Sequence, residues 1–279
     1  MELLSEVFFP GIEIMFDAII LAGGLGTRLR EVVGDVPKPM ALVKGKPFLE
    51  LQLEFLIRQG FSRALLSIGY KGDVIANHFG SRYRTLNLVY VREDRPLGTG
   101  GAVRAALSFC QSEAVFVFNG DTYIDLDCSD ILKYWAIKPR GVIVGRVVSN
   151  PGRFGRLLLD GDNVIGIDND CTATGDTIIN AGCYLLPRDS LDTAPMTQPF
   201  SLERDFLPSC LPHNPFALHL MNGLFIDIGV PSDYALSQSL LASVAVSRNG
   251  GSGETSNMTA SSTEERSRPQ RQHLAHGES

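Results

Sequence analysis

The sequence lacks the features that define membrane and exported proteins. No apolar run approaches the roughly 20 residues that a helix needs to cross a bilayer. Residues 1–15 contain three glutamates and no lysine or arginine, so they lack the basic flank of a secretory signal. We therefore expect neither a membrane anchor nor export, and place the protein in the cytoplasm.

Cysteine and positive charge are also scarce. The five cysteines are widely separated and form no C-x-x-C pair, which excludes a disulfide framework and a zinc ribbon. The five histidines form no H-E-x-x-H motif. A formal net charge of −6 argues against a broad nucleic-acid surface, because such binding depends on neutralising phosphates with lysine and arginine. An anionic ligand would have to meet a local cluster of positive charge.

Composition divides the 279 residues into three parts. Residues 1–15 are expected to be an N-terminal extension. Residues 247–279 hold four arginines, four glutamates, seven serines and three threonines but few apolar residues. Such a segment cannot offset its ordering entropy by burial, which predicts a flexible polar tail without net charge. Residues 16–246 are expected to form the folded domain, which then carries the whole negative balance.

Apolar runs alternate with helical patterns in the first half of this domain. Predicted strands cover residues 16–22, 64–68, 86–91 and 114–118, and predicted helices cover residues 48–59, 74–79 and 100–109. Such strands pair in parallel through right-handed crossovers. Later strands are predicted over residues 142–148, 155–159, 163–167 and 177–186, joined by turns. The predicted fold is α/β, with a mixed, mostly parallel central sheet.

The main functional signal follows the first predicted strand. Residues 21–29 read LAGGLGTRL, and residues 37–39 read PKP. A glycine-rich turn at the carboxyl end of a strand brings backbone N–H groups close to an anion. The loop is not a P-loop, which needs Gly-Lys-Ser/Thr, and Leu29 stands where the dinucleotide fingerprint needs a glycine. Residues 28–46 contain five lysine or arginine side chains and only two carboxylates, which supplies the local positive charge.

The loop and the PKP segment resemble the G-G-x-G-T-R-L and P-K-P signature of the sugar-nucleotide pyrophosphorylases, a family of nucleotidyltransferases, and the resemblance extends over residues 16–241. The stretches most similar to its D-glycero-α-D-manno-heptose 1-phosphate guanylyltransferases are residues 36–41, 45–49, 66–71, 96–102 and 119–122. The resemblance implies a Rossmann-like nucleotidyltransferase fold. It also implies that GTP and heptose 1-phosphate give GDP-heptose, a surface polysaccharide precursor, and pyrophosphate. Guanylylation of mannose 1-phosphate and uridylylation of another sugar phosphate are the alternatives.

The chemistry of this reaction suits the charged residues. A sugar phosphate is largely dianionic at neutral pH, so it needs charge neutralisation and alignment on the α-phosphorus of the nucleotide. Arg28 is the candidate for the transferring phosphate and the departing pyrophosphate, and Lys38 for bridging the phosphates. Asp121, after an apolar run, and Asp227, which resembles the second metal aspartate of the family, are expected to hold Mg²⁺, which takes one or two carboxylates plus substrate phosphates.

The resemblance implies that Glu93 contacts the nucleobase. Guanine presents N1–H and an exocyclic amine side by side, and a carboxylate can accept from both, whereas uracil and thymine offer a single donor. This favours GTP. The other expected nucleotide contacts are Leu21, Ala22, Gly23, Gly24, Gly26, Thr27, Gly98, Thr99, Asn119 and Gly120.

The resemblance implies sugar contacts from Gly155 and Asn180. Glu203 is a further candidate, although an acidic residue at a helix start explains it equally well.

One position departs from the family. Many relatives have Glu-Lys, with the lysine on the sugar phosphate, where this sequence has Asn169-Asp170. A carboxylate there would repel the phosphate, so a replacement cation is expected from Arg153, Arg156 or Arg204. The departure also keeps open a regulatory subunit that binds a sugar nucleotide with weak turnover and partners an active homologue. A homo-oligomer is a further expectation.

Overall fold

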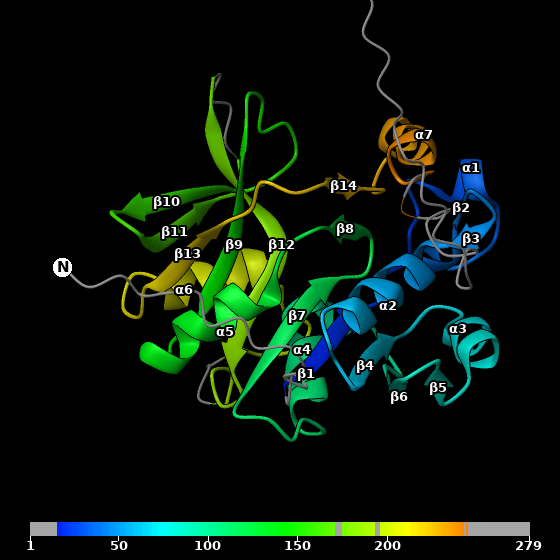
Figure 1. Cartoon of the computed structure of the whole chain (residues 1–279), viewed down its shortest axis with the longest axis horizontal. Helices are drawn as coiled ribbons and strands as arrows, with labels where there is room; N and C mark the ends of the chain where they lie inside the picture. Colours follow the sequence, from blue (N-terminus) through cyan, green and yellow to red (C-terminus); the bar gives the residue numbers. More distant parts are fainter. Residues whose placement is uncertain (1–15, 171–174, 193–195, 243, 245–279) are drawn as a thin grey trace, which may run out of the picture. The chain divides into compact units, whose positions relative to one another are not determined.

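The computed structural model describes residues 16–170, 175–192, 196–242 and 244, which build one large sheet and two small ribbons (Figure 1). The predicted N-terminal extension and the predicted tail lie outside these residues, as does Cys171. The other four cysteines are free thiols. No helix in the described part of the chain is long and apolar enough to cross a membrane.

Parallel strands form the first half of the sheet, as the sequence predicts. The order β7-β1-β4-β6 is parallel throughout. The strands are β1 (Asp17–Leu21), β4 (Arg63–Ile68), β6 (Leu86–Arg92) and β7 (Ala114–Asn119), and the helices between them are α2 (Phe48–Arg58), α3 (Gly72–Phe79) and α4 (Gly98–Leu107). These bounds agree with the predicted ones to within two residues. The carboxyl ends of the four strands therefore meet at one edge, where ligands bind in α/β sheets.

The second half of the sheet is largely antiparallel. Its strands are β9 (Val142–Val148), β10 (Arg156–Asp160), β11 (Asn163–Asp168), β12 (Thr177–Pro187) and β13 (Phe216–Leu220), and β5 (Arg82–Tyr83) is the far edge. The full order is β10-β11-β13-β9-β12-β7-β1-β4-β6-β5. In it four neighbouring pairs are parallel and five antiparallel, so the sheet is mixed as predicted but not mostly parallel. The tight hairpin β10–β11 replaces a helical crossover, and the other antiparallel pairs of this half join strands that are not consecutive in the chain.

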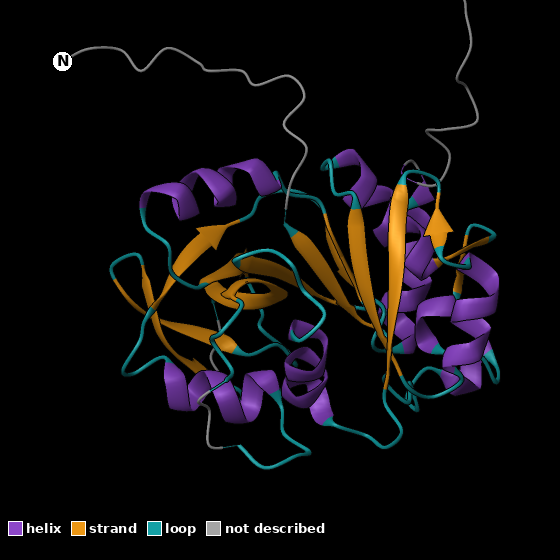
Figure 2. Ribbon diagram, turned by 90° about the horizontal axis from the view of Figure 1, so that it is seen from below, coloured by secondary structure: helices purple, strands orange, loops and turns teal. Residues whose placement is uncertain are grey.

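Helices cover both faces of the sheet (Figure 2). Alternate residues of β1 point to opposite faces: Ala18 and Ile20 pack with α2, α3 and α5 (Cys128–Ile137), and Ile19 packs with α4. The face of Ile19 is completed by η2 (Leu202–Phe206), a π-helical turn, and α6 (Leu207–Cys210). Two buried cores therefore hold the sheet and fix the edge that carries the site.

Short elements complete the site edge. A ribbon of β8 (Thr122–Ile124) and β14 (Phe225–Asp227) pairs Thr122 with Asp227. The remaining elements are α1 (Arg30–Val33), the 3-10 turn η1 (Lys38–Met40), the ribbon of β2 (Leu42–Val43) and β3 (Lys46–Pro47), and α7 (Pro231–Leu240). The β8–β14 ribbon thus brings the end of the domain to the segment that follows β7.

Candidate active site

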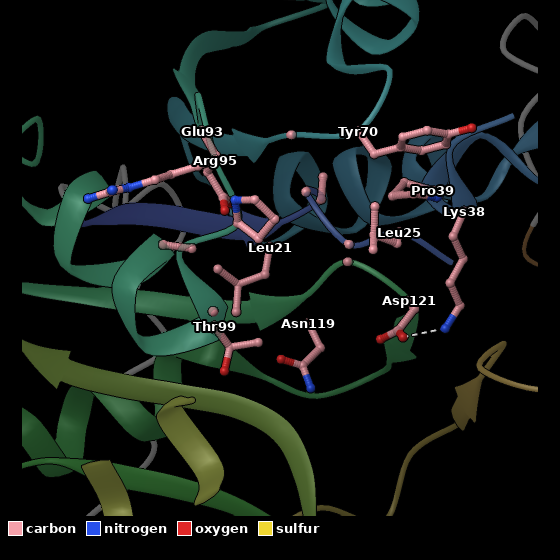
Figure 3. Close-up of a pocket in the computed structure, with 18 of the residues that line it drawn as sticks. Leu21, Leu25, Lys38, Pro39, Tyr70, Glu93, Arg95, Thr99, Asn119 and Asp121 are labelled. Atoms are coloured by element: carbon pink, nitrogen blue, oxygen red, sulfur yellow. Dashed lines mark hydrogen bonds and ion pairs between the residues drawn. The ribbon is translucent and has the colours of Figure 1, made fainter. Parts of the chain in front are cut away.

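A cavity of about 560 Å³ opens at the carboxyl ends of the parallel strands. The predicted site residues that line it are Leu21, Ala22, Gly23, Gly24, Lys38, Glu93, Gly98, Thr99, Asn119, Gly120 and Asp121. Glu93 lies at one end and the ion pair of Lys38 with Asp121 at the other (Figure 3). Gly69 and Tyr70, which follow β4, also line the cavity, although no role was predicted for them. Their place after an apolar strand was the signal that could have identified them.

The glycine loop continues directly from β1. The amide of Ala22 donates to the Ser67 carbonyl (2.8 Å), which ties the start of the loop to β4. Gly26 has φ +59°, and a Cβ there would lie 2.9 Å from the Lys38 Cβ, so glycine allows the loop and Lys38 to approach. Gly26, Thr27 and Arg28 are not among the residues that line the cavity. Arg28 is exposed and forms no hydrogen bond or ion pair within the described residues, so its guanidinium is available to a ligand.

The Glu93 carboxylate, just after β6, is held in place by two donors. Its Oε1 accepts from the Ser67 hydroxyl (3.1 Å) and its Oε2 from the Leu97 amide (3.1 Å). A carboxylate has about four acceptor positions, so each oxygen retains capacity for another bond. Arg95 also lines the cavity, but its side chain extends away from the other labelled residues (Figure 3). Glu93 is therefore a fixed pair of acceptors.

The turn after β7 carries Asn119, Gly120 and Asp121. A Cβ on Gly120 would lie 2.3 Å from the Leu21 carbonyl oxygen, so a side chain cannot be accommodated there. Buried Gln52 on α2 spans the turn, because its Nε2 donates to the carbonyls of Asn119 and Thr122, both at 2.8 Å. The Asn119 Oδ1 is buried without a hydrogen-bond partner in the described structure, which leaves an acceptor beside the cavity.

The two predicted metal carboxylates lie on neighbouring segments of the β8–β14 ribbon. The Ile228 amide donates to the Asp121 carbonyl (2.8 Å). The Thr122 hydroxyl is 3.3 Å from Asp121 Oδ1 and 3.2 Å from Asp227 Oδ2. Burial, followed by the Asp121 carboxylate, raises the pKa of Asp227, while Lys38 and Arg153 oppose this shift. A cation bound to both carboxylates would relieve the repulsion between them further.

These residues fit the predicted Mg²⁺. Across the described residues no cluster of three or more His, Cys, Asp or Glu side chains could hold a metal ion. Mg²⁺ does not need such a cluster where substrate phosphates and water complete its coordination. Asp121 and Asp227 provide two hard oxygen donors, and Lys38 and Arg153 act as their counter-ions in the protein alone.

The predicted sugar contacts form a hydrogen-bonded chain and do not line the cavity. The Asn180 amide donates to the Gly155 carbonyl (2.9 Å), and Asn180 Nδ2 donates to the Tyr184 hydroxyl (2.7 Å). Tyr184 donates to Glu203 Oε1 (3.3 Å), and Thr99 donates to Glu203 Oε2 (2.8 Å). Burial raises the pKa of Tyr184 well above its usual value, and the Glu203 carboxylate raises it further. Glu203 therefore links Thr99 of α4, at the nucleotide side, to Tyr184 of β12. The sequence analysis did not identify Tyr184.

The departure from the family leaves a neutral side chain beside Gly155. A Cβ on Gly155 would lie 2.8 Å from Asn169 Oδ1, and Asn169 Nδ2 donates to the Glu203 carbonyl (3.1 Å). Asp170 is exposed. Arg156 pairs with Asp168 across the β10–β11 hairpin (3.0 Å). Among the three candidate arginines, Arg153 reaches the Asp227 carboxylate.

Comparison with known proteins agrees with this geometry. The model of the nucleotidyl transferase family matches residues 17–243. The D-glycero-α-D-manno-heptose 1-phosphate guanylyltransferase of Campylobacter jejuni subsp. jejuni serotype O:2 is 36% identical over 217 residues, 78% of this chain and 96% of the relative. The enzyme of the same name from Aneurinibacillus thermoaerophilus is 35% identical over 224 residues, 80% of this chain and 96% of the relative.

A solved structure is similar over the same region. The crystal structure of HddC from Yersinia pseudotuberculosis complexed with GMP-PN superposes with a TM-score of 0.73 at 37% identity, and covers 81% of this chain and 99% of that one. The sequence match, the shared fold and the glycine loop beside paired aspartates lead to one conclusion: the chain belongs to the nucleotidyl transferase family.

Proposed function

We propose that the protein is a magnesium-dependent guanylyltransferase that joins GTP to a sugar 1-phosphate, with D-glycero-α-D-manno-heptose 1-phosphate as its substrate. A phosphate oxygen of the sugar 1-phosphate attacks the α-phosphorus of GTP. The bond from that phosphorus to the β-phosphate oxygen breaks, and the products are GDP-heptose and pyrophosphate. The observation that carries the proposal is the placement of the Glu93 acceptors and the Lys38–Asp121 pair at the two ends of one cavity. The names of the two relatives support the choice of substrates.

Glu93 favours guanine among the nucleobases. Its oxygens are fixed by Ser67 and Leu97, so the carboxylate pays little ordering entropy when it accepts from the N1–H and the exocyclic amine. Uracil or thymine would satisfy one oxygen and set a carbonyl against the other, which is repulsive. The base specificity therefore comes from a rigid acceptor pair.

Charge neutralisation drives the transfer. Lys38 and Arg28 would meet the triphosphate, and Asp121 and Asp227 would hold Mg²⁺. When bound, the ion neutralises phosphate charge and aligns the phosphates. Electrostatic stabilisation and alignment account for most of the catalysis in phosphoryl transfer, so no general base is assigned. The free thiols of the described cysteines and the GTP substrate agree with a cytoplasmic site of action.

A panel of nucleotides and sugars tests the proposal. GTP, UTP, ATP and dTTP are each combined with heptose, mannose and glucose 1-phosphates in MgCl₂, and pyrophosphate release is measured. We expect the highest kcat/KM for GTP with the heptose 1-phosphate. A preference for mannose 1-phosphate or for UTP would select one of the alternative transferase activities. If no combination of nucleotide and sugar phosphate releases pyrophosphate, the proposed transferase activity is refuted.

The regulatory alternative is favoured by a single observation, the neutral Asn169 with the adjacent Asp170. Thermal shift separates it from the enzyme, because a regulatory subunit would be stabilised by GDP-sugar yet release no pyrophosphate. The ion pair of Lys38 with Asp121, and the Thr122 hydroxyl that lies within hydrogen-bond distance of both Asp121 and Asp227, support the enzyme.

A further inference from the structure

Arg153 connects the sugar side of the site to the predicted metal carboxylates. It lies in the loop between β9 and β10, two residues before Gly155. Its Nη2 is 2.5 Å from Asp227 Oδ1, and its Nη1 is 2.5 Å from Asp233 Oδ2 on α7. The guanidinium carbon is 4.7 Å from the centre of the Phe154 ring. The neighbouring ring of Phe154 and two carboxylates from β14 and the start of α7, 74 and 80 residues further along the chain, thus fix this guanidinium.

The reacting phosphates must meet at the same place. An in-line attack puts the sugar phosphate next to the α-phosphorus, and the α-phosphorus next to the metal carboxylates. A Cβ on Gly229 would lie 3.4 Å from both Arg153 Nη2 and Lys38 Nζ, so two cations converge there. Lys38 approaches from the glycine-loop side and Arg153 from the side of Gly155. Arg153 is therefore the cation on the expected path of the sugar phosphate.

Formal charge sets the condition under which Arg153 can bind a phosphate. Lys38 and Arg153 face Asp121, Asp227 and Asp233, so the cluster carries a net charge of −1 in the protein alone. That cluster repels a phosphate dianion. With a divalent ion held by Asp121 and Asp227, the cluster would carry +1, and Asp227 would no longer need Arg153 as its counter-ion.

Arg153 has the donors for such an exchange. A guanidinium carries five N–H groups, and its planar fork matches phosphate oxygens in pairs. Nη2 donates to Asp227 Oδ1 and, at 3.4 Å, to the Asp227 carbonyl, and Nη1 donates to Asp233 Oδ2, which leaves Nε and one Nη1 hydrogen. The side chain is 29% exposed, so the remaining donors are accessible. Release from Asp227 adds another donor while Asp233 keeps the side chain in place.

We propose that Arg153 binds the phosphate of the sugar 1-phosphate, and that it does so after a divalent ion has replaced it as the counter-ion of Asp227. This inference rests on the proposed function. It gives Arg153 the task that the lysine performs in relatives with Glu-Lys, in a chain that has Asn169-Asp170 instead. Arg153 then counts as a catalytic residue, because it touches the substrate.

A purely structural role predicts the opposite effect on metal binding. If Arg153 only held Asp227 in position, its loss would weaken the binding of a divalent ion. If instead a divalent ion replaces Arg153 as the counter-ion of Asp227, Arg153 competes with the ion. Removal of the Arg153 side chain then leaves ion binding unchanged or makes it tighter. The two roles therefore differ in sign, and a binding measurement separates them without turnover.

The test uses calorimetry on the full chain with α,β-methylene GTP, which cannot be cleaved at the reacting bond. Wild type, Arg153→Gln, Arg153→Lys and Arg204→Gln are titrated with D-glycero-α-D-manno-heptose 1-phosphate in MgCl₂. A second series titrates Mn²⁺ and follows the free ion by electron paramagnetic resonance. Arg204→Gln tests a competing candidate for the sugar phosphate, because Arg204 is an exposed arginine whose side chain forms no hydrogen bond or ion pair within the described residues. Thermal unfolding checks that each variant is folded.

We expect Arg153→Gln to raise the Kd for the sugar phosphate by roughly 10- to 100-fold, the range for a lost hydrogen bond between charged groups. Its Mn²⁺ affinity should be unchanged or higher. Arg153→Lys should fall between wild type and Arg153→Gln, since lysine keeps the charge without the fork. Arg204→Gln should bind as wild type does.

Weaker Mn²⁺ binding by Arg153→Gln would overturn the proposal that the ion replaces Arg153 at Asp227. The proposal would also fall if Arg204→Gln, and not Arg153→Gln, lost sugar-phosphate binding. If wild type binds the GTP analogue but no sugar phosphate, the proposed function falls together with the inference. If wild type and Arg153→Gln bind the sugar phosphate equally, only the inference falls.

Discussion

Gln52 offers a sharp test of how the site is built, because it supports the Asp121 turn without lining the cavity. Gln52→Met keeps the length of the side chain but removes two donors. Each buried carbonyl left without a partner costs about 1–3 kcal/mol. The Gln52 Oε1 is itself buried without a partner in the described structure, so its removal offsets part of that cost. We expect the free energy of unfolding to fall by about 1–3 kcal/mol. This lowers Tm by about 2–12 °C for a domain of this size.

The effect on magnesium distinguishes positioning from simple stability. Residues that orient a metal ligand typically change metal affinity by about 10- to 100-fold when they are removed. The MgCl₂ concentration that gives half-maximal pyrophosphate release should therefore rise by about that factor. Binding of GTP without metal, measured by fluorescence titration, should stay near the wild-type value, because Gln52 does not reach the cavity.

Gln59 provides the control for Gln52. It also bonds a backbone group from the end of α2, since its Oε1 accepts from the Cys128 amide (2.8 Å), but it supports α5 and not the site. Gln59→Met should lower Tm without changing the magnesium dependence. Equal magnesium dependence in Gln52→Met and wild type, or the same shift in both variants, would refute the reasoning.

The other predictions concern single groups in the site and one in the core. Glu93→Gln replaces an acceptor by a donor, so kcat/KM for GTP should fall at least about 10-fold while that for UTP changes less; an unaltered GTP:UTP ratio would contradict the assignment. Arg28→Gln should lower kcat by about 10²–10³ in pyrophosphate release, and a normal kcat would remove Arg28 from the mechanism. Asp227→Asn should raise the MgCl₂ requirement about 10-fold or more, whereas an unchanged requirement would exclude it as a ligand. Burial raises the pKa of Cys110 to about 12, so iodoacetamide at pH 8 should label Cys110 in unfolded but not in folded protein by mass spectrometry, and equal labelling would contradict its burial.

The parallel half of the fold was predictable because its signals are local. β1, β4 and β7 are mostly apolar and buried on both faces, β6 is a partly exposed apolar run, and α2 repeats apolar residues at helical spacing before Gly60. The glycine loop, the PKP segment and the residues after β7 follow these strands directly. Most of the cavity lining therefore lies in short motifs next to predictable elements.

The rest of the fold depends on contacts that leave little local pattern. Helix α7 buries Ser237 as its one fully buried residue, so it has no strong apolar stripe, and it was not predicted. β13 inserts between β11 and β9, and its pairing with β9 is parallel across a long connection. The number of parallel strand pairs in the sheet therefore could not be predicted from strand patterns alone.

The residues that support the site are harder still to predict. Gln52 lies 67 residues from Asn119, and Arg153 lies 74 residues from Asp227. Nothing near Gln52 or Arg153 in the sequence marks their partners. The motifs identify the groups that face a ligand, whereas the side chains that hold those groups are chosen by the folded structure.

The two strands of the β8–β14 ribbon are far apart in the sequence, so the ribosome makes the two parts of the candidate active site at different times. Every residue that lines the cavity lies between Leu21 and Asp121, but the ribbon supplies the second carboxylate only at Asp227. At a translation rate of about 5–20 residues per second, the ribosome needs roughly 5–20 s to add this second half. During that interval the nascent chain has all of its cavity-lining residues and one of its two proposed metal ligands. The proposed magnesium-dependent turnover can begin only after Asp227 has been added, so it would report the pairing of β14 with β8.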